Sequence, residues 1–171
     1  MRRLALICAP LLALAAPTVA WALTAGPNDG TLVVKNGTAP KGVPVVTLVI
    51  TGAAVGHISN LGTIVIDDVT PNDPYAPEVS NANWHKDVSD TGTATKCGGT
   101  NMKFRAVGGT YKITIYGSGV DLSAVGHGVV TLAGMPDTTV GDGTYSLNGD
   151  PFHSLPASPL PKLAIGVTSN G

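Results

Sequence analysis

Two stretches of the chain, residues 45–68 and 111–134, repeat one plan: an apolar or alternating run, a glycine-rich segment and a second such run. In the second stretch Tyr111, Ile113 and Ile115 alternate with Lys and Thr, which is the period of a strand with one buried face. We therefore expect each stretch to form a strand–turn–strand unit, and we expect the unit at 111–134 to organise the fold.

Glycines separate the strands that this pattern predicts. Residues 43–50 (VPVVTLVI) are almost continuously apolar and β-branched, which predicts a central strand buried on both faces. The glycine-rich residues 51–56 and 117–128 are interpreted as turns. Residues 108–109 are interpreted as a tight turn that follows an alternating strand at 101–107.

Shorter strands are expected outside these stretches. Residues 29–37 and 142–149 share the punctuation DGT…NG, which brackets a short strand with turn residues. Residues 163–166 fit a last edge strand. Residues 69–98 contain three prolines and no clear apolar period, so we expect a long loop there. No stretch shows about ten residues of helical period, and the chain is predicted to be all-β.

An offset of 65 places residues 47–52 over residues 112–117, with Gly52 over Gly117 at the end of the match. This predicts an internal duplication, with half-repeats at about 30–68 and 99–134. A duplicated set of strands favours a single-domain β barrel or sandwich with pseudo-two-fold symmetry, because each half alone would leave an apolar face and open edges. The proline-rich region at 142–167 is expected to add strands to this domain.

Residues 1–22 have the features of a secretory signal peptide. Arg2 and Arg3 precede an apolar run of about 13 residues, and Ala20-Trp21-Ala22 offers small residues for cleavage. The run is too short to span a membrane, which takes ~20 residues. We expect export to the extracellular space or cell envelope, cleavage after Ala22, a single domain at 23–171 and no transmembrane segment in the mature chain.

Charge and cysteine content exclude several classes. Removing Arg2 and Arg3 from 10 basic residues leaves 8 against 11 acidic ones, a net charge of −3. That balance argues against nucleic acid as a partner. Only Cys97 remains after cleavage, so no internal disulfide is expected, and we interpret this thiol as buried or incidental.

Residues 98–134, and above all GSGVDLSAVGHGVVTLAG, resemble a segment of small exported β-rich proteins of high-GC Gram-positive bacteria. The resemblance extends loosely over DGTLVVKNG and DGTYSLNG. These proteins are uncharacterised, so the resemblance implies export and a β fold but assigns no activity and no binding residue.

Hard oxygen ligands cluster at the end of one expected strand. Asp67, Asp68, Asn72 and Asp73 offer carboxylate and amide oxygens of the kind that Ca²⁺ prefers. The spacing of a Ca²⁺-binding loop is absent, and prolines interrupt the cluster. A weak Ca²⁺ site is one interpretation, and solvated strand-end residues are the other. No other cofactor is expected.

Aromatic residues in the expected loop suggest a binding surface. Tyr75, Trp84 and the neighbouring His85 are candidate ligand-binding residues, since aromatic rings stack on sugars and other flat groups. Aromatic residues make up only 5% of the chain, which is low for a lectin-like surface.

Asp121, Ser123 and His127 lie close in sequence but lack the setting of a catalytic triad. No strand-to-helix nucleophile elbow surrounds Ser123, and we expect Asp121 to accept hydrogen bonds from backbone N–H groups instead. His57 and His127 occupy the two expected turns, where a shared metal would require them to approach each other.

No catalytic constellation emerges from the sequence. We therefore expect a secreted, non-catalytic binding domain or a cell-envelope-associated domain, with an unknown ligand and a cell-wall component or protein as the partner. The alternative is a secreted hydrolase with its active rim at residues 68–96. The two are distinguished by whether Asp73, Asp87 or His85 meets His57 or His127 in one pocket.

Overall fold

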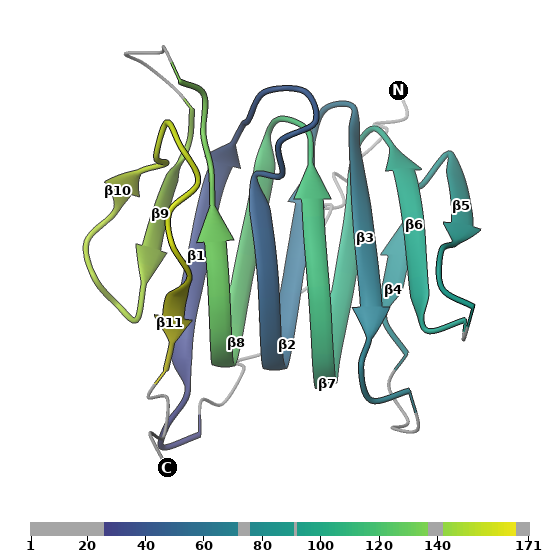
Figure 1. The fold of residues 1–171 in the computed structure, drawn as a ribbon, viewed down its shortest axis with the longest axis horizontal. Helices are drawn as coiled ribbons and strands as arrows, with labels where there is room; N and C mark the ends of the chain where they lie inside the picture. Colours follow the sequence, from purple (N-terminus) through teal and green to yellow (C-terminus); the bar gives the residue numbers. More distant parts are fainter. Residues whose placement is uncertain (1–25, 72–75, 91, 137–141, 167–171) are drawn as a thin grey trace, which may run out of the picture.

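A computed structural model describes residues 26–71, 76–90, 92–136 and 142–166. They form one antiparallel sheet that is folded into two layers, and they contain no helix (Figure 1). The strands are β1 (Gly30–Gly37), β2 (Val46–Ile58), β3 (Gly62–Asp68), β4 (Glu78–Ser80), β5 (Trp84–Asp87), β6 (Ala94–Gly99), β7 (Met102–Tyr116), β8 (Val120–Leu132), β9 (Thr144–Leu147), β10 (His153–Ser154) and β11 (Leu163–Ile165).

Three long strands lie at the centre of the sheet. The order is β10-β9-β1-β8-β2-β7-β3-β6-β5, and β11 and β4 pair with β8 and β7. β2 pairs along its whole length with both β7 and β8. The expected strand–turn–strand units are therefore interleaved: β7 and β8, which are consecutive in sequence, are separated in the sheet by β2. The unit at 111–134 is not a paired hairpin, and that prediction was wrong.

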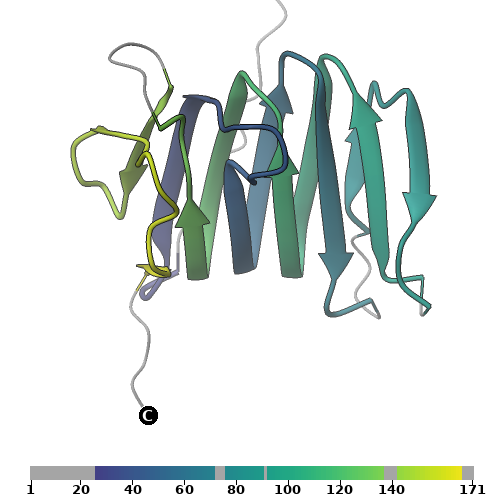
Figure 2. The ribbon, with the colours of Figure 1, turned by 45° about the horizontal axis from the view of Figure 1, so that its top comes forward.

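The long strands bend midway, and the bend creates the two layers (Figure 2). The front layer of Figure 1 contains β11, β3, β6, β5 and the segments 128–132 of β8, 46–51 of β2 and 110–116 of β7. The back layer contains β10, β9, β1, β4 and the segments 120–125, 53–58 and 102–107 of the same three strands. The fold is therefore a sandwich whose layers are continuous through three strands.

Glycines form the bend, which we call the glycine crease and define by Gly52, Gly108, Gly109 and Gly126. Gly52 lies opposite Gly126 on one side and Gly109 on the other, and the register of β2 against β7 shifts just after Gly52. Gly52, Gly108 and Gly126 have φ values of 143°, 89° and 147°. Such values favour glycine, because other residues suffer a clash of the side chain with the backbone.

The space around the crease also excludes residues other than glycine. A Cβ atom on Gly52 would collide with the carbonyl oxygen of Val125, and one on Gly126 would collide with that of Thr51. The two backbones approach each other too closely for a side chain. In β7 the bend is closed by Tyr111, whose hydroxyl donates to the Val107 carbonyl at 3.0 Å.

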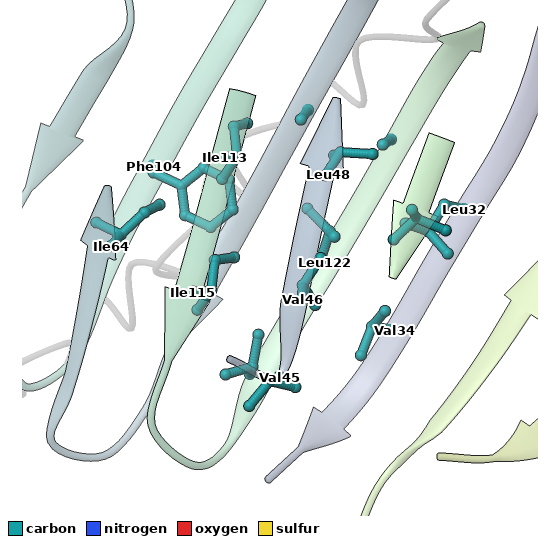
Figure 3. Packing of buried hydrophobic residues seen from close by; sticks show 14 of the residues in the cluster. Leu32, Val34, Val45, Val46, Leu48, Ile64, Phe104, Ile113, Ile115 and Leu122 are labelled. Carbon is teal, nitrogen blue, oxygen red and sulfur yellow. The ribbon is translucent and has the colours of Figure 1, made fainter. Parts of the chain in front are cut away.

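The apolar core fills the space between the layers. Alternate residues of every long strand point inward, as is usual for a sheet with one buried face. The strand expected at 43–50 is central, but the expectation that both of its faces are buried was wrong, because Val49 on its outer face is 37% exposed. Side chains of the front layer meet those of the back layer in one continuous cluster (Figure 3). Its members include Val46, Leu48, Ile64, Ile113 and Ile115 from the front and Leu32, Val34, Phe104, Ala124 and Leu122 from the back.

Three sequence-based expectations are corrected by these strands. Residues 69–98 are not one long loop, because β4, β5 and most of β6 lie within them. Residues 51–56 and 108–109 lie inside β2 and β7, and β8 begins at Val120, so the turn expected at 117–128 is confined to its first residues. The glycines interpreted as turns are mostly bends inside continuous strands.

The architecture confirms the all-β class and decides between barrel and sandwich. β10 and β5 are the two ends of the sheet, which does not close. The predicted duplication is not shown: the offset of 65 places Gly52 over Gly117, yet β2 continues through Gly52 while β7 ends at Tyr116. Within the described ranges, no helix has the length and apolar character to cross a membrane.

The close approach at the crease can be tested by comparing two glycines that both have positive φ. Gly52→Ala adds a Cβ that collides with the β8 backbone, whereas Gly42→Ala, at φ 86°, adds one that meets nothing within 4 Å. We expect Gly42→Ala to cost about 1–2 kcal/mol, the strain of the left-handed conformation. Gly52→Ala should cost ~3 kcal/mol or more, because the strands must also move apart.

Guanidinium chloride unfolding of the two variants and the parent measures this difference. Equal losses of unfolding free energy for the two variants would contradict the close approach of β2 and β8.

Candidate functional site

An aromatic platform lies on the outer face of the front layer. Strand register places Trp84 of β5 opposite Gly98 of β6, Gly98 opposite Thr63 of β3, and Thr63 opposite Tyr116 of β7. These four residues form a row across four adjacent strands. We call this row the Trp84–Tyr116 platform.

Trp84 owes its position to Gly98. A Cβ atom on Gly98 would collide with the indole atoms Cζ2 and Cε2, so the ring lies directly over the glycine backbone. Any side chain at position 98 would lift the ring off the sheet. Trp84 remains 46% exposed, because β5 is an end strand with every residue exposed. One side of the indole is therefore packed, and much of the ring remains available to a ligand.

A depression of about 630 Å³ adjoins the platform. Its walls come from the segments 39–42, 61–63 and 116–118, together with Trp84 and Gly99. Leu61, at 74% exposure, adds an apolar wall, and Thr63 and Ser118 add hydroxyl groups. An aromatic surface with a few polar groups at its margin is typical of sites that hold small or chain-like ligands.

The structure places two of the three predicted ligand-binding residues. Trp84 belongs to the platform, whereas His85 is the next residue of β5 and lies opposite Cys97, toward the other face of the sheet. His85 therefore does not act together with Trp84. Tyr75 lies outside the described residues.

The predicted Ca²⁺ ligands do not converge where they are described. Asp67 and Asp68 are consecutive in β3 and point to opposite faces. Asp67 accepts from Thr93 Oγ1 at 3.1 Å, and the buried Asp68 accepts from the Thr70 N–H at 3.0 Å. Asn72 and Asp73 lie outside the described residues. The described part of the chain contains no group of three or more His, Cys, Asp or Glu residues that fits a metal ion.

A second depression, of about 710 Å³, lies on the outer face of the back layer. Val33 and Val55 line it together with the charged groups of Lys35, Lys103 and Arg105. His57 and Asp121 face each other across β2 and β8 in the same depression. Asp87 and His85 do not line it, so the convergence expected for the hydrolase alternative is not found there.

Both ring nitrogens of His57 form hydrogen bonds. Its Nε2 is 2.6 Å from Asn101 Oδ1, and its Nδ1 is 3.3 Å from Ser59 Oγ. With the amide oxygen as acceptor, Nε2 carries the proton and Nδ1 accepts from Ser59. The Ser59 N–H donates to Gly119, and the Asn101 N–H donates to Ser59. These N–H groups are already used, so they do not form an oxyanion hole beside Ser59.

Asp121, Ser123 and His127 lie along one face of β8 rather than around one point. Asp121 Oδ1 accepts from the Asn36 N–H at 2.9 Å, which is the backbone-capping role expected of it. His127 lies beyond the crease, where its Nδ1 is 3.3 Å from Asp29 Oδ1. The Gly26 N–H bond to Asp29 is the main cause of the lowered pKa of this carboxyl, and His127 adds to it.

His57 and His127 do not meet. His57 pairs with Asp121 and Thr51 pairs with His127, so the two imidazoles are six residues apart along the ladder, on opposite sides of the crease. This spacing corresponds to roughly 20 Å of strand. A metal shared between them is excluded.

Sequence reasoning missed most of the platform. It named Trp84 as a candidate but placed it, together with Gly98, in the loop expected at 69–98, and it did not name Tyr116 as a candidate. Gly98 carried a signal, since a glycine within a strand often marks a close approach by another group. The register that brings Tyr116 and Thr63 into the same row joins strands from distant parts of the chain, and no local pattern encodes it.

No protein-family model matches the chain, and neither a curated protein nor a solved structure is significantly similar to it. The arrangement of its own residues is therefore the basis for a function.

Cys97, at 5% exposure on β6, is a buried free thiol. Burial raises its pKa, so a smaller fraction is thiolate at any given pH. We expect native mature protein to react with an aromatic disulfide reagent about 100-fold more slowly than unfolded protein, because reaction requires opening of the sheet.

The control for this measurement is Cys97→Ser/Ser158→Cys, which moves the thiol to an exposed position. This variant should react at the unfolded rate in native buffer. Equally fast labelling of native Cys97 would contradict its burial.

Proposed function

We propose that this protein is an exported, non-catalytic binding domain that holds a glycan of the cell envelope on the Trp84–Tyr116 platform. The observation that carries the proposal is the position of Trp84. Its indole lies over Gly98 in the same row as Thr63 and Tyr116, and it is held there with nearly half of its surface exposed.

The geometry suits a sugar ring. A pyranose presents C–H groups on one face and hydroxyl groups around its edge. The C–H face packs against the negative face of an aromatic ring, and the hydroxyls exchange hydrogen bonds with neighbouring polar groups. Thr63 and Ser118 supply hydroxyl groups beside the platform, and Leu61 extends its apolar part.

A polymer rather than an isolated small molecule fits this surface. The platform crosses four strands on the outside of the sandwich and continues into an open depression, so a chain can pass over it without entering the core. The core between the layers is filled by side chains, so ligand contacts are made on the outer faces. Export by the predicted signal peptide would place this surface among envelope glycans.

The fluorescence of Trp84 can report ligand binding, because Trp84 is the only Trp after Ala22. In mature protein, binding of oligosaccharides released from cell walls should shift the Trp emission to shorter wavelength. We expect Trp84→Ala to reduce affinity, measured by calorimetry, about ten-fold or more, corresponding to ~1.4 kcal/mol of lost stacking.

The matched control is Phe152→Ala. Phe152 is 48% exposed, like Trp84, but lies beyond β9, where it contacts Lys35 Nζ at 4.4 Å from its ring centroid. This variant should bind as the parent does. Unchanged affinity in Trp84→Ala, or an equal loss in Phe152→Ala, would refute a glycan site on the platform.

A further inference from the structure

The row of residues beside the platform is positively charged. Lys86 lies two residues after Trp84 in β5, and Lys96 lies two residues before Gly98 in β6. The two lysines are directly opposite each other. Both side chains project from the same outer face as Trp84, because strand residues alternate. The two rows are about 7 Å apart, so one ligand chain can contact both.

Opposed lysines are unfavourable in an unliganded sheet. Directly opposite residues of an antiparallel pair have Cβ atoms ~5 Å apart, and like charges at this spacing destabilise the pair. Among the described residues, neither ammonium group has a carboxylate within ion-pair distance. Asp87 neighbours Lys86 in sequence but lies on the opposite face, where it accepts from Thr95 Oγ1 at 3.4 Å.

The 630 Å³ depression, on the other side of the platform from the lysine pair, is also positively charged. Lys41 is the only charged residue that lines it. The nearest acidic residue on this outer face of β3, Asp67, lies one row beyond Lys96, opposite Lys112. A chain with a net charge of −3 after cleavage thus has lysines on both sides of its aromatic platform.

We infer that the ligand of the platform is an anionic glycan. Its sugar ring stacks on Trp84, and a carboxylate or phosphate of the same or the next unit accepts hydrogen bonds from the ammonium groups of Lys86 and Lys96. The anion removes the repulsion between the two lysines, so binding gains more than the attraction to either one alone. This inference rests on the proposed function of the platform.

The test compares three probes with mature protein, using Trp84 emission and calorimetry. An oligogalacturonate carries carboxylates, a poly(glycerol phosphate) teichoic acid with sugar substituents carries phosphates, and a galactan oligomer is neutral. We expect at least one anionic probe to bind ~10-fold more tightly than the neutral one at low salt. That advantage should shrink several-fold by 0.3 M salt, because exposed charges are screened.

The variant Lys86→Gln/Lys96→Gln removes both ammonium groups from the row. It should lose ~10-fold in affinity for the anionic probe and keep its affinity for the neutral one. Its melting temperature should be equal to or above that of the parent, because a like-charge pair has been removed. The control Lys35→Gln/Lys162→Gln makes the same change in net charge away from the platform and should bind as the parent does.

Each outcome bears on a separate claim. Equal, salt-independent affinity for neutral and anionic probes would overturn the anionic specificity and leave the glycan site standing. An equal loss in the Lys35→Gln/Lys162→Gln control would reduce the effect to net charge and overturn the role of the lysine pair. Failure of every probe to perturb Trp84 would overturn both proposals. The two anionic probes distinguish a carboxylate from a phosphate source.

Discussion

The close approach of two backbones at the glycine crease is the constraint on which the rest of the structure depends. At Gly52 and Gly126 the β2 and β8 chains leave no room for a Cβ atom, and Gly52 faces a third glycine, Gly109, on its other side. Three adjacent strands therefore bend along one line. A flat sheet of these strands would expose its apolar face on every strand. The bend brings the two halves of that face together, so that one sheet supplies both walls of its own core.

This arrangement fixes where function can reside. The inner faces are occupied by a continuous apolar core, and no disulfide is needed to hold the layers, because three strands connect them covalently. The outer faces are therefore available to ligands. On the front layer, β5 is the last strand, and its Trp84 packs on the glycine backbone of β6. The platform is thus built at the edge, where the ring stays exposed and its support is rigid.

The proposed site also shows a local conflict with stability. A half-exposed indole and an opposed lysine pair each cost the free protein something, since apolar surface stays in water and like charges repel. Among the described residues every buried polar side-chain atom has a hydrogen-bond partner, so these costs arise at the surface and not in the core. Unfavourable features that a ligand can relieve are expected on functional surfaces.

The sequence by itself determined the all-β class and, in a strand that alternates such as 111–116, which residues face the core, because these depend on alternation within a few neighbouring positions. It also offered Trp84 as a candidate binding residue, and it left Cys97 as either buried or incidental. Only the tertiary structure decided that Gly52 and Gly126 are bends rather than turns. A glycine permits both, and the choice depends on which backbone lies opposite. The row from Trp84 to Tyr116 was likewise decided by pairing between strands far apart in sequence, a non-local contact that no local pattern encodes.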